Sequence, residues 1–202
     1  MYVPGDQRKA ISKLIDFRKS VEYVREVKSI VRSEFEVAKA ELISDLNKHA
    51  VTREIESGPK GSNTSGTLGG RGNLFAFIGF QAGTDPITPI RAAFDQIILT
   101  TTMIRRDGSA ESYVMSPSAD DIFRITPLPW ADGRSWAEGI ERGIANLGQF
   151  LNKPIDESRS GGGIQSKNSV SSASFKPVPY ISKMLSDFDK KIVGLNNRIY
   201  IS

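Results

Sequence analysis

Few residues of this chain could take part in catalysis or bind a metal, and histidine is the first to consider. His49 is the single histidine among 202 residues, and the sequence contains no cysteine. Zinc sites and cysteine–histidine dyads need several such side chains, so neither can be assembled here. A serine–histidine–aspartate triad would have to use His49, but no G-x-S-x-G motif presents a serine nucleophile. We therefore expect His49 to be structural, at the end of a helix, where its ring can bond to terminal carbonyls.

Adjacent carboxylates are the next candidates. Asp120 and Asp121 could together bind a hard cation. However, Ser118 and Asp121 have the spacing of a helix capping box, and carboxylates are favoured in the first turn of a helix. The pattern therefore predicts a helix start, with no metal and no cofactor. Nothing else resembles an active site, so we predict that the chain is not an enzyme; a small hydrolase that uses carboxylates is the weaker alternative.

Residues 58–72 read G-P-K-G-S-N-T-S-G-T-L-G-G-R-G, a composition that could cradle a phosphate. The Walker pattern G-x-x-x-x-G-K-[ST] is absent. Gly70 and Gly72 supply the first half of a dinucleotide fingerprint, but Phe75 stands where its third glycine belongs. These glycines also precede a predicted strand and not a helix N-terminus. We instead predict a loop that contacts a partner molecule. Its candidate contact residues are Gly66, Gly69, Gly70, Arg71 and Gly72.

The run F-A-F-I-G-F at 75–80 matches the last six positions of the inner strand of an RNA-recognition motif, with Ile in place of Val. In such a strand, Phe75 and Phe77 would share one face and stack on bases. Asn73 and Leu74 do not fit the first two positions, and the companion aromatic strand is missing. We therefore predict a buried core strand, with a nucleic-acid-binding module as the alternative. That module would use Phe75, Phe77, Arg105 and Arg106.

A long helix is predicted at the N-terminal end, because residues 6–47 contain neither proline nor glycine and their apolar residues recur at steps of three and four. A continuous helix of this length extends about 60 Å, whereas a compact domain of this size has a radius of gyration of about 16–17 Å. Its apolar stripe needs cover from another element or from a neighbouring subunit, unless the helix breaks near Ser29–Ser33. We favour the neighbouring subunit. The candidate subunit interface is Leu14, Val21, Val24, Val31, Phe35 and Leu42.

The remaining elements indicate an α+β fold, because strands and helices do not alternate as βαβ units require. We predict a long N-terminal helix, a small, mostly antiparallel sheet, an amphipathic helix packed on that sheet, and a C-terminal arm and helix. Asp107-Gly108 predicts the turn of a hairpin, and Ser135 the start of the amphipathic helix. Two further strands are expected at 49–56 and 74–80. The predicted domains are a core (1–151), a linker or arm (152–179) and a C-terminal helix and tail (180–202).

The composition indicates which partners and which cellular compartment to expect for the protein. The net charge is +4, a mild and scattered excess that does not by itself indicate nucleic acid. No stretch approaches the ~20 apolar residues of a membrane-spanning helix, and the N-terminus lacks the apolar run of a signal peptide. We therefore expect a protein that is made in a reducing cytoplasm and does not associate with membranes.

The stretch from His49 to Ile90, preceded by a helix and followed by a hairpin and an amphipathic helix, resembles the tail-completion and neck proteins of tailed bacteriophages. The resemblance implies a virion structural protein, made in the host cytoplasm. Its copies would form a homo-oligomeric ring at the head–tail junction. Its partners would be other head and tail proteins, namely the portal or connector and the tail tube or terminator. DNA would pass through the channel of the ring without sequence recognition.

Overall fold

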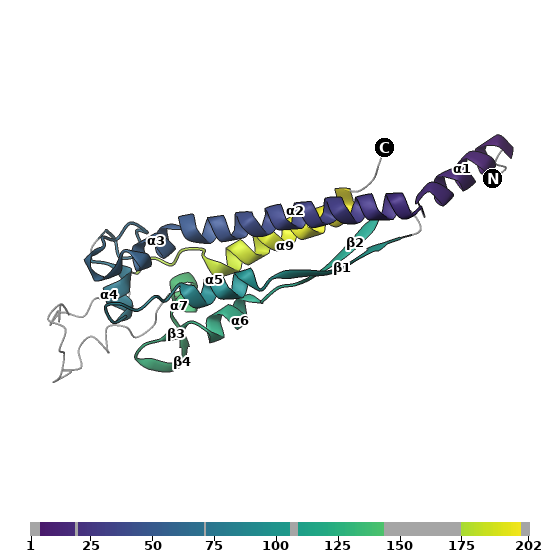
Figure 1. Ribbon diagram of the computed structural model, residues 1–202. Coiled ribbons are helices and arrows are strands. Elements are labelled where there is room, and N and C mark those ends of the chain that lie inside the picture. The colour runs from purple at the N-terminus through teal and green to yellow at the C-terminus, as the bar shows by residue number, and fades with distance from the viewer. Residues whose placement is uncertain (1–4, 19, 71, 106–108, 144–174, 199–202) are drawn as a thin grey trace, which may run out of the picture. The chain divides into compact units, whose positions relative to one another are not determined.

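The computed structural model shown in Figure 1 describes residues 5–18, 20–70, 72–105, 109–143 and 175–198. It has the predicted α+β composition, with a long helical N-terminal region, a small antiparallel sheet and a C-terminal helix. The helices are α1 (Gly5–Arg18), α2 (Val21–Lys48), α3 (Ala50–Glu56), the 3₁₀ turn η1 (Gly58–Lys60), α4 (Leu74–Ile78), α5 (Thr88–Asp95), α6 (Ala119–Arg124), α7 (Trp136–Arg142) and α9 (Ile181–Arg198). The strands are β1 (Ile98–Ile104), β2 (Ala110–Met115), β3 (Pro127–Leu128) and β4 (Ala131–Ser135).

The chain folds as two compact units, and each is built from segments that are distant in sequence. Unit 1 comprises residues 1–42, 96–116 and 186–202, and unit 2 comprises 43–95 and 117–185. Helices α2 and α9 each contribute residues to both units. These units cut across the sequential division into core, arm and C-terminal helix that composition suggested.

The predicted N-terminal helix is in fact two helices. α1 ends at Arg18 and α2 begins at Val21. The hydroxyl oxygen of Ser20 accepts a hydrogen bond from the Tyr23 amide at 3.2 Å, which satisfies an otherwise unpaired donor at the start of α2. The break therefore lies N-terminal to Ser29–Ser33, and it is associated with a serine cap.

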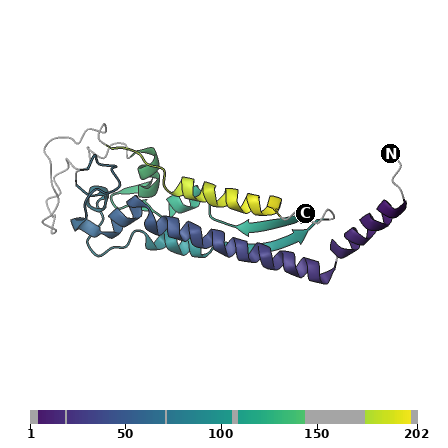
Figure 2. The same cartoon turned by 90° about the horizontal axis from the view of Figure 1, so that it is seen from above.

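In unit 1, α2 packs its buried stripe against its own chain. Tyr23, Val27 and Val31 form a cluster with Ala110 of β2, and Leu99 and Ile104 of β1 pack against it. Figures 1 and 2 show the α9 part of this unit running beside α2, and the hairpin extending along the same two helices. The contact between α2 and α9 includes the rings of Phe35 and Phe188, whose centroids are 6.5 Å apart.

The predicted hairpin is confirmed. β1 and β2 pair antiparallel from Ile98 opposite Met115 to Ile104 opposite Ala110, with an irregularity between Leu99 and Thr101. Asp107 and Gly108 at the predicted turn lie outside the described residues. Because side chains alternate across a strand, the residues that do not face α2 lie together on the opposite face of this two-stranded sheet.

Two strand predictions in unit 2 are wrong. Residues 50–56 form helix α3, with Val51 and Ile55, four positions apart, both buried. Residues 74–78 form helix α4. Asn73 caps its start by accepting from the Ala76 amide at 2.8 Å, and Gly79 ends it in the left-handed conformation with a φ of 89°. The short apolar run is compatible with either structure, and these two caps accompany the helix.

The other short helices of unit 2 begin where their serine caps predict. Ser118 and Asp121 form the reciprocal capping box of α6, and the Ser135 side chain accepts from the Glu138 amide at the start of α7. Trp136 is buried in the core. Residues 144–174, which include most of the predicted arm, and the last residues of the chain lie outside the described residues.

The described end of the arm is part of unit 2. The Lys176 amide donates to the Thr67 carbonyl at 2.8 Å, and the Val178 amide donates to the Ile140 carbonyl at 3.1 Å. Tyr180 follows and is fully buried, with its hydroxyl 2.7 Å from that of Thr52. These contacts attach the segment that leads into α9 to α7, to the glycine-rich loop and to α3.

Candidate assembly surface

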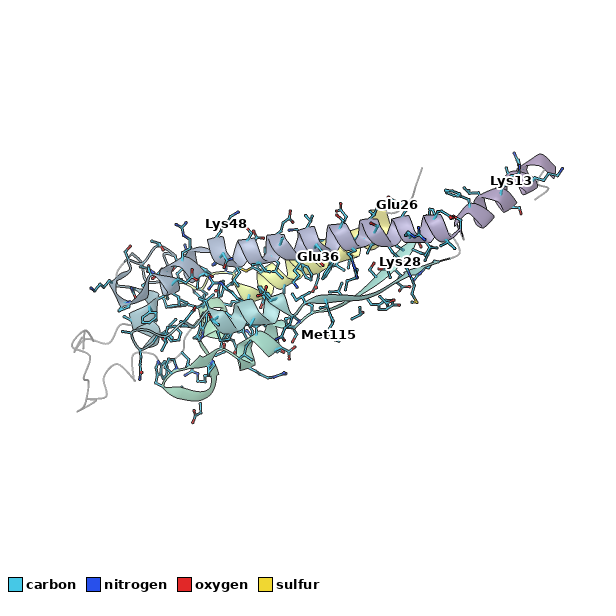
Figure 3. The ribbon with its side chains drawn as sticks, in the orientation of Figure 1. Lys13, Glu26, Lys28, Glu36, Lys48 and Met115 are labelled. Atoms are coloured by element: carbon cyan, nitrogen blue, oxygen red, sulfur yellow. The ribbon has the colours of Figure 1, made fainter. Side chains whose placement is uncertain are left out.

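Helix α1 carries an apolar stripe that its own chain leaves exposed. Ile11, Leu14, Phe17 and, at the start of α2, Val21 follow one another at steps of three, three and four residues. Their side chains are between 49% and 66% exposed. The side chain of Lys13, labelled in Figure 3, lies on the same helix. A helix with one uncovered apolar side is the form that packs against another surface.

The hairpin has a second uncovered apolar face. Ile98 and Met103 of β1 and Tyr113 and Met115 of β2 are between 44% and 63% exposed. Ile98 pairs directly with Met115, so these two side chains are cross-strand neighbours. Met115 is labelled on this face in Figure 3. We call these four residues the outer hairpin face, since the cluster with Tyr23, Val27 and Val31 covers the other one.

The six predicted interface residues therefore fall into two groups. Val31, Phe35 and Leu42 are at most 3% exposed, because the chain itself covers them. They are not available to a neighbouring subunit, and including them in the interface was wrong. Val24 is half-buried, whereas Leu14 and Val21 are exposed. The predicted interface contracts to the N-terminal end of the stripe and gains Ile11 and Phe17.

The glycine-rich loop is organised by a buried carboxylate that sequence reasoning did not select. Glu54 of α3 is 1% exposed. Its oxygens accept from the Asn63 side-chain amide at 2.8 and 3.0 Å and from the backbone amides of Ser65 at 2.9 Å and Leu74 at 2.7 Å. Asn63 in turn accepts from the amides of Leu68 and Gly70. These bonds tie residues 63–74 to α3.

The candidate contact glycines lie at the exposed edge of this loop. Gly66, Gly69, Gly70 and Gly72 all have positive φ angles, between 62° and 80°, a conformation that other residues adopt at a cost. No side chain lies close enough to exclude a larger residue at Gly66, Gly69 or Gly70. These positions therefore favour glycine because of their backbone conformation, and not because a larger side chain would clash with a neighbour. Arg71 lies outside the described residues, and contact of the loop with a partner stays a prediction.

The predicted nucleic-acid residues do not form a base-stacking platform. Phe75 is 2% exposed and lies on a helix, not on a strand. Phe77 is half-buried and stacks on Phe175, with ring centroids 5.8 Å apart and planes 9° apart. Arg105 donates to the Glu111 carboxylate at 2.8 and 3.0 Å, and Arg106 lies outside the described residues. An aromatic strand that reads bases is thus contradicted by the burial and helical structure of this segment.

His49 is structural, although not in the predicted manner. It precedes α3, and its Nδ1 accepts from the Val51 amide at 3.3 Å, so it caps the start of α3 and not the carbonyls that end α2. Burial lowers the pKa of His49, and a hydrogen bond to the Pro179 backbone partly opposes this effect. Its ring lies 4.8 Å from that of Tyr180. Burial also raises the pKa of the Tyr180 hydroxyl well above its ordinary value.

The carboxylate pair at the start of α6 serves the capping box. Asp121 accepts from the Ser118 hydroxyl at 2.7 Å and from the Ser118 amide at 2.9 Å, and these bonds, the first more than the second, lower the pKa of Asp121. Within the described ranges, no three His, Asp or Glu side chains form a group that could hold a metal ion. No described helix is both long enough and apolar enough to cross a bilayer.

Comparison with known proteins adds no relative to this picture. No protein-family model matches the chain, and neither a curated protein nor a solved structure matches it. The functional argument therefore depends on the surfaces described above and on the resemblance noted in the sequence.

Proposed function

We propose that this chain is a non-enzymatic structural protein of the head–tail junction of tailed bacteriophages, where copies form a ring that joins the head connector to the tail. The observation that carries the proposal is the pair of uncovered apolar surfaces in unit 1, the α1 stripe and the outer hairpin face. Neighbouring exposed apolar side chains on a protein surface often mark a site where another molecule binds. Two separate patches on one chain suit a subunit that contacts a neighbour on each side.

In this role, the loop at 58–72 and the arm at 152–179 would contact other virion components. The partners are the portal or connector on the head side and the tail tube or terminator on the tail side. DNA would pass through the channel, where the net charge of +4 is compatible with a polyanion but provides no sequence recognition. The assembled protein would therefore be located in the virion.

Two measurements test this function together. As the concentration of the purified protein rises, its measured mass should approach that of a single closed oligomer. Adding the protein to separated heads and tails from a phage mutant that lacks it should then restore their joining. A chain that stays monomeric at every concentration, and that binds neither portal nor tail proteins, would contradict the proposal.

A further inference from the structure

We propose that α1 of one copy packs on the outer hairpin face of the next copy. This inference rests on the proposed ring and names the two surfaces that build it. The stripe is Ile11, Leu14, Phe17 and Val21, and its acceptor is Ile98, Met103, Tyr113 and Met115. Because the contact joins two different surfaces, each copy places its α1 on the hairpin of one neighbour and accepts the α1 of another neighbour on its own hairpin.

The α1 stripe and the outer hairpin face both carry apolar side chains, and the two elements have similar lengths. α1 has 14 residues and so extends about 21 Å, and the 7 residues of β1 extend about 23 Å. The hairpin is covered on one side by α2. On its outer face Ile98 lies opposite Met115, Tyr113 lies opposite Thr101, and Met103 lies opposite Glu111, which is paired with Arg105. A sheet with two apolar faces is stable when helices cover both of them. A second helix on the outer face would complete a helix–sheet–helix arrangement.

As long as α1 ends at Arg18 and α2 begins at Val21, the α1 of a copy cannot reach the outer hairpin face of the same copy. α2 already occupies the inner face of the hairpin. A helix on the opposite face lies about two layers away, or roughly 20 Å, given a spacing of about 10 Å per layer. The link from Arg18 to Val21 spans at most about 11 Å even when fully extended. The α1 that reaches the outer face must therefore come from another copy.

A single contact between the α1 stripe and the outer hairpin face is small. It joins four apolar side chains of one copy to four of the next, whereas a stable pairwise interface has about 20–30 residues a side. One contact of this kind is therefore not expected to hold two copies together by itself. A contact between unlike surfaces can close into a ring in which every copy makes two contacts. Ring closure then supplies the stability that a single pair lacks.

Engineered cysteines can test the pairing directly, because the natural sequence contains no cysteine. One preparation carries Leu14→Cys on α1, and a second carries Met115→Cys on the hairpin. They are mixed under ring-forming conditions and treated with a short bis-maleimide cross-linker. Glu36→Cys, at an exposed position of α2, replaces Leu14→Cys in the matched control. We expect covalent heterodimers of Leu14→Cys with Met115→Cys, and only background with Glu36→Cys.

The alternative pairings give different products. Predominant Leu14→Cys homodimers would mean that α1 packs on α1, and Met115→Cys homodimers would mean that hairpin packs on hairpin; either result would overturn the inference. Equal yields from the Glu36→Cys control would overturn it as well. If native mass spectrometry shows a closed ring but heterodimers are absent, the pairing is wrong and the proposed function survives. If only monomers are found, both fail.

Charged variants provide a second test that does not depend on cross-linking. Leu14 and Met115 are 49% and 63% exposed, so Leu14→Asp and Met115→Asp should fold, as far-ultraviolet circular dichroism can verify. Each should cause loss of the ring at concentrations where the natural chain assembles. Glu36→Ala should leave assembly unchanged. A ring that persists in Met115→Asp would rule out the outer hairpin face as the acceptor.

Discussion

Glu54 shows how one side chain can determine the structure of a whole loop. Its carboxylate is buried and accepts from Asn63, Ser65 and Leu74, so it replaces the water that these donors would otherwise bind. Such charge-assisted bonds are roughly twice as strong as neutral ones. The loop therefore owes its structure to a residue that precedes it in the chain, and not only to its own glycines.

We expect Glu54→Gln to lower the free energy of unfolding by about 2–3 kcal/mol, because an amide NH₂ would be placed against backbone donors. Urea denaturation of both proteins measures the difference. Glu36→Gln, at an exposed site, is the control and should change stability by less than about 0.5 kcal/mol. A Glu54→Gln protein as stable as the natural one would show that the carboxylate does not hold the loop.

His49 should make stability depend on pH. Burial lowers its pKa in the folded protein, so the unfolded chain binds a proton more readily. Stability is therefore complete above the ordinary pKa of 6.5 and decreases as pH falls through and below that value. Protonation of Nδ1 would also remove the acceptor for the Val51 amide.

The variant His49→Asn separates this contribution from others, because asparagine caps helices but does not titrate in this range. We expect the unfolding free energy of the natural chain to fall between about pH 7.5 and about pH 5.5, and that of the variant to fall clearly less. Chemical denaturation at each pH provides the comparison. Parallel profiles for the two proteins would assign the dependence to other groups.

At the scale of elements, local signals predicted only some of the structure. The helical spacing of α2 and the Ser118 capping box act within a few residues, and the helices they predict are present. The strands on either side of Asp107-Gly108 pair as predicted. α3 and α4 were mistaken for strands because runs of 7 and 5 residues are too short to show a helical period clearly. For α4, the caps at Asn73 and Gly79 were the missed signal.

Only part of the candidate assembly surface could be predicted from the sequence, because distant segments decide which apolar residues are covered. The sequence identifies the apolar stripe of the N-terminal region, but which part is covered depends on the distant hairpin and on α9. Leu14 and Phe35 look alike in a periodic pattern, yet one is exposed and the other is buried. Alternation along β2 places Tyr113 and Met115 on one face. Ile98 and Met103 are an odd number of residues apart, and they share that face only because of the irregularity between Leu99 and Thr101, which the sequence does not reveal.

The reassignment of the aromatic segment to α4 leads to a further prediction. Phe75→Ala should lower the free energy of unfolding by about 3–5 kcal/mol, because the ring is 2% exposed and its removal leaves a cavity. Phe77→Ala, at a half-buried position, should cost less. Thermal or urea unfolding compares the two variants. A stable Phe75→Ala protein that binds single-stranded RNA more weakly than the natural chain would instead revive the base-stacking hypothesis.

At the scale of the whole molecule, folding and assembly should be separable. Removing residues 1–18 deletes α1, whose described apolar side chains are exposed, so the thermal unfolding midpoint of the remaining monomer should change little. The closed oligomer should disappear, because each contact loses one of its two surfaces. Light scattering at matched concentrations measures the second effect. A truncated chain that still forms the full oligomer would place the subunit interface elsewhere.

The interleaving of the two units also affects how the protein is made. Residues 1–42 share a unit with 186–202, and 43–95 share one with 117–185, so each unit needs a segment that is made long after its first one. Unit 1 needs α9, and unit 2 needs the segment that leads into α9. During synthesis, Tyr23, Val27 and Val31 of α2 stay uncovered until the hairpin has been made, and Phe35 lacks the ring of Phe188 until α9 has been made. A stop codon anywhere before Tyr180 would thus yield a product in which both units are unfinished, and not a folded half.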